Sequence, residues 1–140
     1  KKLRDEWKGK LIVKGVLDPE DAKKIKDAGA DAVYVSGHGA RQLDSLPAPI
    51  TQLPKIRKAV GKSFPLIFDT GVRNGEDVVK AYASGADFVM LGRPVLYALG
   101  ADGERGLKTI MNYISKEIQV TLAQIGLSKI SDVNETNLIR

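Results

Sequence analysis

The chain has 140 residues, of which 43% are hydrophobic and 28% charged, and a formal net charge of +5 at pH 7. This length suits one domain with one hydrophobic core, and the composition is that of an ordinary globular protein. Cysteine is absent and there is one histidine, which excludes a disulfide framework, thiolate catalysis and a cysteine- or histidine-rich metal site. No apolar run is long enough to span a bilayer, and no signal-peptide pattern is present.

The positive charges are dispersed along the chain, and aromatic residues make up only 6% of it. A nucleic-acid interface would concentrate basic residues in a stripe with aromatic side chains between them. We therefore expect no nucleic acid partner, and we expect small anions such as phosphates or carboxylates instead.

Short apolar runs alternate with helical patterns along the chain. Strands are predicted at 11–16, 32–36, 65–69 and 87–91, and helices at 19–28, 50–60, 76–84 and 104–125. A glycine-rich link is expected before the last helix, and the tail 127–140 shows no clear periodicity. The first residues, 1–7, look like the end of a helix whose start is missing, so we expect a fragment or one product of a cleaved chain.

Two of the units are similar in sequence, because Asp27–Val33 and Ala83–Val89 both end a helix on glycine and start a strand after Gly-Ala-Asp. A repeated strand–helix unit indicates either a (β/α) barrel or an open doubly wound sheet. Four such units are half of an eight-unit barrel.

The distinctive polar residues follow the predicted strands. In parallel α/β folds the site lies at the carboxyl ends of the strands. These ends carry Lys14, Ser36, His38, Arg41, Asp69, Gly71, Arg73, Gly92 and Arg93. We therefore predict one site on this rim of the sheet.

The last two turns have the features of a phosphate cradle. Gly71 and Gly75 would let backbone amides approach an anion at the start of the helix near Glu76, and Gly92 and Arg93 would add a second close approach and a cation. The alternative is that the glycines are ordinary turn residues and the arginines are solvated. Each turn alone favours that alternative, whereas the two turns together favour the cradle.

Lys14 and His38 also have two interpretations each. Lys14 either acts electrostatically on a ligand or extends from the rim into solvent. A lone histidine is more often a polar loop residue, but Gly37 and Gly39 leave room around the ring and Arg41 could clamp a carboxylate. Histidine changes protonation near neutral pH, which suits a general base.

These motifs resemble the FMN-dependent α-hydroxy acid oxidases and dehydrogenases, the family of glycolate oxidase, L-lactate dehydrogenase, flavocytochrome b2 and mandelate dehydrogenase. The matching segments are Leu11–Gly15, Ser36–Asp44, Asp69–Gly75 and Leu91–Pro94. The His-Gly-x-Arg-Gln-Leu-Asp string is highly specific, whereas Gly-Arg-Pro is shared with other FMN barrels. The resemblance implies that residues 1–140 are strands 5–8 and the C-terminal helix of a (β/α)8 TIM barrel.

The resemblance also implies a role for each site residue. His38 would be the base that acts on an L-2-hydroxy acid, and Arg41 would hold the substrate carboxylate while a 2-oxo acid forms. Lys14 and Ser36 would contact the flavin ring. The FMN ribityl chain and phosphate would be bound by Asp69, Gly71, Arg73, Gly92 and Arg93.

Three positions depart from the family pattern, which usually has asparagine at Gly37, glycine at Thr70 and often arginine at Asn74. The resemblance places the rest of the flavin pocket, the acid that orients the histidine and a second arginine in the N-terminal half of the barrel. Expected partners are therefore that half, a small 2-hydroxy acid, an electron acceptor (oxygen, quinone or cytochrome) and further copies in a homo-oligomer, a tetramer. The expected location is the cytoplasm, or the inner membrane surface as a peripheral protein.

Two alternatives stay open from the sequence. One is another FMN barrel, such as an isopentenyl-diphosphate isomerase or an IMP-dehydrogenase-like enzyme. The other is a non-catalytic half-barrel that associates with itself through its exposed edges.

Overall fold

The computed structural model describes residues 2–138, so the outermost residues of the predicted 1–140 unit, Lys1, Ile139 and Arg140, lie outside the described part. The strands are β1 (Ile12–Val16), β2 (Ala32–Val35), β3 (Leu66–Phe68) and β4 (Phe88–Val89). The helices are α1 (Lys2–Glu6), α2 (Pro19–Asp27), α3 (Pro49–Val60), α4 (Gly75–Ala83) and α5 (Arg93–Gln124). Short 3₁₀ turns lie at η1 (His38–Ala40), η2 (Ile130–Asp132) and η3 (Glu135–Asn137).

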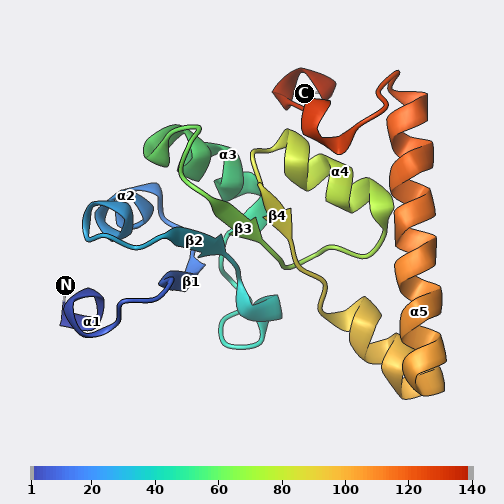
Figure 1. Ribbon diagram of the computed structural model, residues 1–140, viewed down its shortest axis with the longest axis horizontal. Coiled ribbons are helices and arrows are strands. Elements are labelled where there is room, and N and C mark those ends of the chain that lie inside the picture. Colours follow the sequence, from blue (N-terminus) through green and yellow to red (C-terminus); the bar gives the residue numbers. More distant parts are fainter. Residues whose placement is uncertain (1, 139–140) are drawn as a thin grey trace.

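The four strands form one parallel sheet in the order β1-β2-β3-β4 (Figure 1). A doubly wound sheet reverses its strand order at a switch point, whereas a barrel adds its strands in sequence. The sheet is therefore half of a (β/α)8 barrel, and the open-sheet alternative is wrong.

One face of the sheet is buried under helices, and the other is open. Val33, Val35 and Leu66 are fully buried in a core that also contains residues of α2, α3, α4 and α5. On the other face, Ile12 and Phe88 are about half exposed. A row of aligned residues, Lys14, Tyr34, Ile67 and Phe88, crosses this open face.

The helix starts agree with their capping residues. Asp18 accepts the amides of Glu20 and Asp21 at the start of α2, and Asn74 accepts the amide of Asp77 at the start of α4. Pro54 lies inside α3, beyond its first turn, so the helix lacks the hydrogen bond that an amide there would donate to the carbonyl of Ile50.

The last helix, α5, consists of two helical segments joined by a kink, and its second segment begins at 104, as predicted. The residues from Arg93 to the kink, which were predicted to form a glycine-rich link, are helical instead. Pro94 suits a first helical turn, and the interruption is confined to Asp102 and Gly103, whose backbone is not helical. β4 is also shorter than predicted, with two residues in place of five. In the tail, η2 and η3 are isolated turns.

Candidate active site at the carboxyl ends of the strands

A cleft of about 570 Å³ opens at the carboxyl ends of the strands. It is lined by Lys14, His38, Gly39, Arg41, Asp69, Thr70, Gly71, Val72, Arg73, Met90, Gly92, Arg93 and Leu96. Eight of the nine predicted site residues line this cleft, and the ninth, Ser36, is buried directly beneath it. The structure therefore brings together residues that the sequence separates by almost 80 positions.

Lys14 and Asp69 are the centre of a hydrogen-bonded cluster on the floor of the cleft. The Lys14 ammonium donates to Ser36 Oγ at 2.8 Å and pairs with Asp69 Oδ2 at 3.2 Å. The Tyr34 hydroxyl donates to the same carboxylate oxygen at 2.8 Å, and the Lys14 ammonium lies 4.4 Å from the centre of the Tyr34 ring. Lys14 is thus held toward the cleft by an anion, a hydroxyl and an aromatic face, which removes the alternative of a lysine free in solvent.

The cluster keeps its acid ionised and its phenol protonated. Burial alone would raise the pKa of Asp69, but hydrogen bonds from Ser36, Thr70, Tyr34 and Lys14 together lower it below its usual value. Burial raises the pKa of Tyr34, and the adjacent Asp69 carboxylate raises it further. A fixed carboxylate and a fixed ammonium therefore lie side by side at neutral pH.

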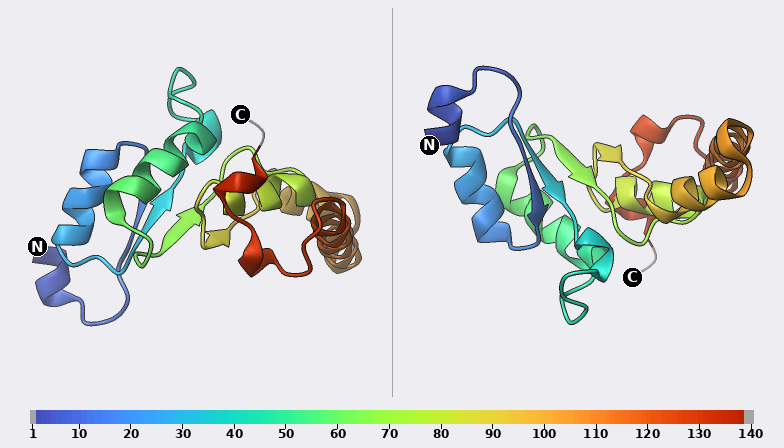
Figure 2. Two further views of the ribbon diagram at one scale, coloured as in Figure 1. Left: turned by 90° about the horizontal axis from the view of Figure 1, so that it is seen from above. Right: turned by 90° about the horizontal axis from the view of Figure 1, so that it is seen from below.

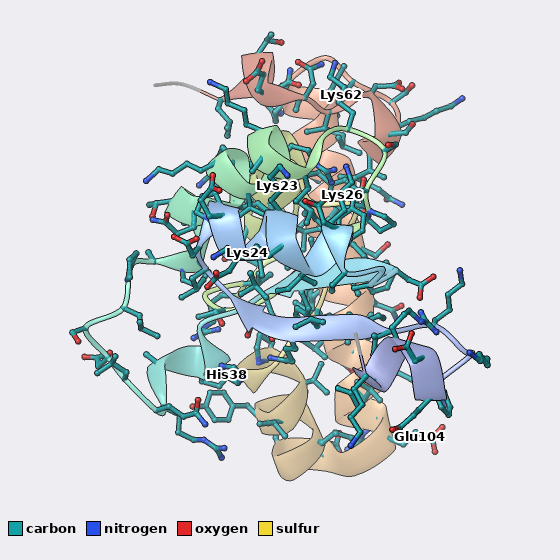
Figure 3. All side chains as sticks on the ribbon, turned by 90° about the vertical axis from the view of Figure 1, so that its left-hand side faces the viewer. Lys23, Lys24, Lys26, His38, Lys62 and Glu104 are labelled. Atoms are coloured by element: carbon teal, nitrogen blue, oxygen red, sulfur yellow. The ribbon has the colours of Figure 1, made fainter. Side chains whose placement is uncertain are left out.

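His38 projects from a loop with unusual backbone angles. Its φ is 51° and that of Ala40 is 62°, in the left-handed region that non-glycine residues seldom occupy. Figure 3 shows His38 on the opposite side of β1 from Lys23, Lys24 and Lys26 of α2. The side chain is exposed, and no side chain within residues 2–138 forms a hydrogen bond with its imidazole. The acid that the family resemblance assigns to orienting this ring is therefore not among these residues.

Gly15 provides the space for the imidazole. It lies at an irregularity in the pairing of β1 with β2, with φ of 91°. A Cβ atom on Gly15 would lie 2.4 Å from His38 Cε1. A side chain here would force the ring to move, so Gly15 is a site residue that the sequence reasoning missed. The signal was a glycine inside an apolar strand, which marks a bulge or a close approach.

Arg41, Arg73 and Arg93 surround the cleft without carboxylate partners in the part of the chain that the structure describes. Arg41 lies just after η1, at the base of an exposed loop that projects from the body of the molecule (Figure 2). Three unpaired guanidinium groups around one hollow attract anions and can bind carboxylate or phosphate through parallel hydrogen bonds.

The predicted phosphate cradle needs one correction. At the start of α4, Glu117 Oε2 accepts the Gly75 amide at 2.8 Å and Asp77 Oδ2 accepts the Arg73 amide, so these two amides are not available to a ligand. The start of α5 is different, since its N-cap residue Gly92 supplies no capping side chain and faces open space. Helix N-termini attract anions, so the start of α5 adds a helix end to the close approach and the cation that the sequence predicts at Gly92 and Arg93.

The residues of the cleft fit FMN. Gly71 has φ of 95°, and a Cβ atom there would have nothing within 4 Å, so a ligand can approach the backbone closely. Arg73, Arg93 and the start of α5 suit the phosphate, Asp69 suits a hydroxyl-bearing chain, and Lys14 suits the electron-rich edge of a flavin ring.

Comparison with known proteins agrees with this geometry. The model of the FMN-dependent dehydrogenase family matches residues 1–140. The chain belongs to the FMN-dependent dehydrogenase family.

Individual relatives are enzymes of 2-hydroxy acids. The L-lactate dehydrogenase of Caulobacter vibrioides is 49% identical over 136 residues, which are 97% of this chain and 36% of that protein. Among solved structures, an (S)-mandelate dehydrogenase, a monotopic membrane protein, matches with a TM-score of 0.94 and 43% identity over 98% of this chain and 36% of that one. A protein described as a lactate oxidase of Pediococcus acidilactici matches with a TM-score of 0.90 and 45% identity over 94% of this chain and 37% of that one. The chain thus spans little more than a third of the length of these relatives.

Proposed function

We propose that the full-length protein that contains this chain oxidises an L-2-hydroxy acid of the lactate or glycolate class to the 2-oxo acid, with FMN as cofactor. The observation that carries the proposal is the convergence of His38, Arg41 and Lys14 on one cleft. A base, a carboxylate-binding cation and a fixed ammonium are the groups that this chemistry needs. Bound FMN would supply the two-electron oxidant.

In this proposal His38 accepts the proton of the substrate 2-hydroxyl on an imidazole nitrogen. Its exposed ring is free of other hydrogen bonds within the described residues, and Gly15 leaves it room. Arg41 binds the substrate carboxylate and thereby orients the hydroxyl toward His38. Lys14 stabilises negative charge that develops in the cleft, because Ser36 and Asp69 hold its ammonium in place.

We further propose that residues 1–140 are strands 5–8 and the C-terminal helix of the barrel, and that the N-terminal half covers the open face of the sheet. Ile12 and Phe88 expose large apolar side chains on that face, and β1 and β4 each pair on one side only within residues 2–138. Unpaired edges and apolar surface call for a partner. The missing half would also bring the remaining site residues, including the acid that orients His38.

Family membership also supports a proposal for the assembly and the location. We propose a homo-oligomer, a tetramer, that passes its electrons to oxygen, a quinone or a cytochrome. No helix within residues 2–138 is long and apolar enough to cross a membrane. We propose a cytoplasmic protein or one attached to the inner membrane surface.

The test uses the purified full-length protein, kept free of oxygen. Its flavin absorption near 450 nm, recorded during titration with L-lactate, glycolate and L-mandelate, should bleach with at least one of them. A flavin-loaded, folded protein whose spectrum none of these acids changes would contradict the proposal and favour another FMN barrel. Sedimentation with and without FMN tests the non-catalytic alternative, which requires self-association without turnover.

A further inference from the structure

The hydroxyl of Thr70 uses all of its hydrogen-bonding capacity within the site. Its oxygen accepts the amide of Gly37 at 3.2 Å and the amide of Gly39 at 3.4 Å, and it donates to Asp69 Oδ1 at 2.8 Å. A threonine hydroxyl has one proton and two lone pairs, so this group is saturated. It connects the loop after β3 to the loop after β2, more than 30 residues earlier in the chain.

The two amides that Thr70 binds lie on either side of His38. The amide of His38 itself donates to Ser36 Oγ at 3.1 Å. Three consecutive backbone amides, 37–39, are therefore held by side-chain oxygens. This explains how the loop keeps a left-handed backbone at His38 and Ala40, where sterics favour other angles.

Thr70 is strained as well. Its φ is 76°, which a β-branched residue rarely adopts. Asp69, which receives the Thr70 proton, is itself fixed by Tyr34 and Lys14. The strained threonine thus ties the His38 loop to the most rigid part of the cleft floor.

We propose that Thr70 is a positioning residue for His38, whose hydroxyl holds the loop so that the imidazole lies over Gly15. The Thr70 hydroxyl bonds the loop backbone and Asp69 and forms no hydrogen bond with the imidazole, so it acts through His38. The kinetic consequence rests on the proposed function, whereas the effect on the loop does not.

Three substitutions in the full-length holoenzyme separate the hydroxyl from the backbone. Thr70→Ser keeps the hydroxyl, Thr70→Val keeps the shape without it, and Thr70→Gly removes both hydroxyl and strain. Thr109→Val is the matched control, because the Thr109 hydroxyl bonds the carbonyl of Arg105 on an exposed turn of α5. Hydrogen–deuterium exchange of peptides covering 36–44 and kcat/KM are measured for each.

We expect Thr70→Val and Thr70→Gly to exchange faster in this segment and to lose about 10- to 100-fold in kcat/KM, the cost of a small misplacement of a catalytic group. Thr70→Ser should stay within about threefold of wild type. Thr70→Gly should lose activity without a lower unfolding midpoint, a split that a merely structural role would not give. Unchanged exchange at 36–44 in both Thr70→Val and Thr70→Gly would overturn the proposal, even in a protein that oxidises no 2-hydroxy acid.

Discussion

The two ends of the sheet use charged side chains in different ways. At the amino ends, Asp31 pairs with Arg4 and Asp87 pairs with Arg57. Each carboxylate also accepts an amide at the amino end of the neighbouring strand, that of Leu11 just before β1 for Asp31 and that of Leu66 in β3 for Asp87. These groups are matched within the chain and leave no charge for a ligand.

At the carboxyl ends of the strands, by contrast, arginine side chains lack carboxylate partners within residues 2–138 and the backbone is strained. Arg41, Arg73 and Arg93 have no carboxylate partner in the described part of the chain, and the non-glycine residues with positive φ there are His38, Ala40 and Thr70. Unmatched charge and strained backbone cost stability and persist where function requires them. The paired carboxylates at the amino ends therefore belong to the fold, whereas the arrangement at the carboxyl ends suits the ligand site that we propose, where barrels of this kind have their sites.

Among the substitutions that compare the two ends of the sheet, we expect the largest loss of activity at Gly15. Gly15→Ala places a methyl group 2.4 Å from the His38 ring, so we expect kcat/KM to fall about 100-fold through displacement of the imidazole. Gly103→Ala is the control, because Gly103 also has positive φ but the added methyl group would have nothing within 4 Å. Activity of Gly15→Ala within about threefold of wild type would show that the contact is unimportant.

At the amino ends we expect loss of stability without loss of activity. Asp87→Ala leaves the Leu66 amide without its acceptor and removes the carboxylate partner of Arg57, so the free energy of unfolding should fall by about 2 kcal/mol while kcat/KM stays the same. Asp27→Ala, which breaks only an exposed pair with Lys23, should change it by less than about 0.5 kcal/mol. Urea denaturation measures both, and a loss of turnover in Asp87→Ala would argue against separate roles.

The smallest effect concerns pH. The Leu11 amide, followed by Lys10 and Arg4, lowers the pKa of Asp31 from 3.8 to about 2. Because the folded pKa is below the unfolded one, this carboxylate stabilises the fold above pH 3.8 and loses that contribution as the pH falls toward 2. Asp31→Asn should flatten the dependence of unfolding free energy on pH in this window, and parallel curves for the two proteins would contradict the assignment.

The sequence predicted much of this division. The Gly-Ala-Asp repeat identified the strand–helix unit. The residues of the cleft were predicted because the site of a parallel fold lies at the carboxyl ends of its strands, and those ends could be located in the sequence. The sequence did not predict that each Gly-Ala-Asp segment binds an arginine, because Arg4 and Arg57 lie at different distances from it along the chain. Both arginines pack on the glycine of the repeat, Gly29 and Gly85, and pair with its aspartate.

Other contacts depend on strand register, which the sequence does not specify. Thr70 was noted only as a departure from the family pattern, yet it binds the loop of His38. Tyr34 was treated as a strand residue, although its hydroxyl reaches Asp69. The helical segment before the kink of α5 was missed because Gly100 and Gly103 resemble a link, and only Asp102 and Gly103 leave the helical conformation.

The most direct test of the account is the rate of anaerobic flavin reduction by a 2-hydroxy acid in His38→Gln, measured by rapid mixing on the full-length protein. Because glutamine is polar and similar in size to histidine, and because His38 lies outside the hydrophobic core, the replacement should leave flavin content and the unfolding midpoint unchanged. The account predicts a rate about 1,000-fold lower than wild type, the scale of a general base. A rate within about threefold of wild type would contradict it.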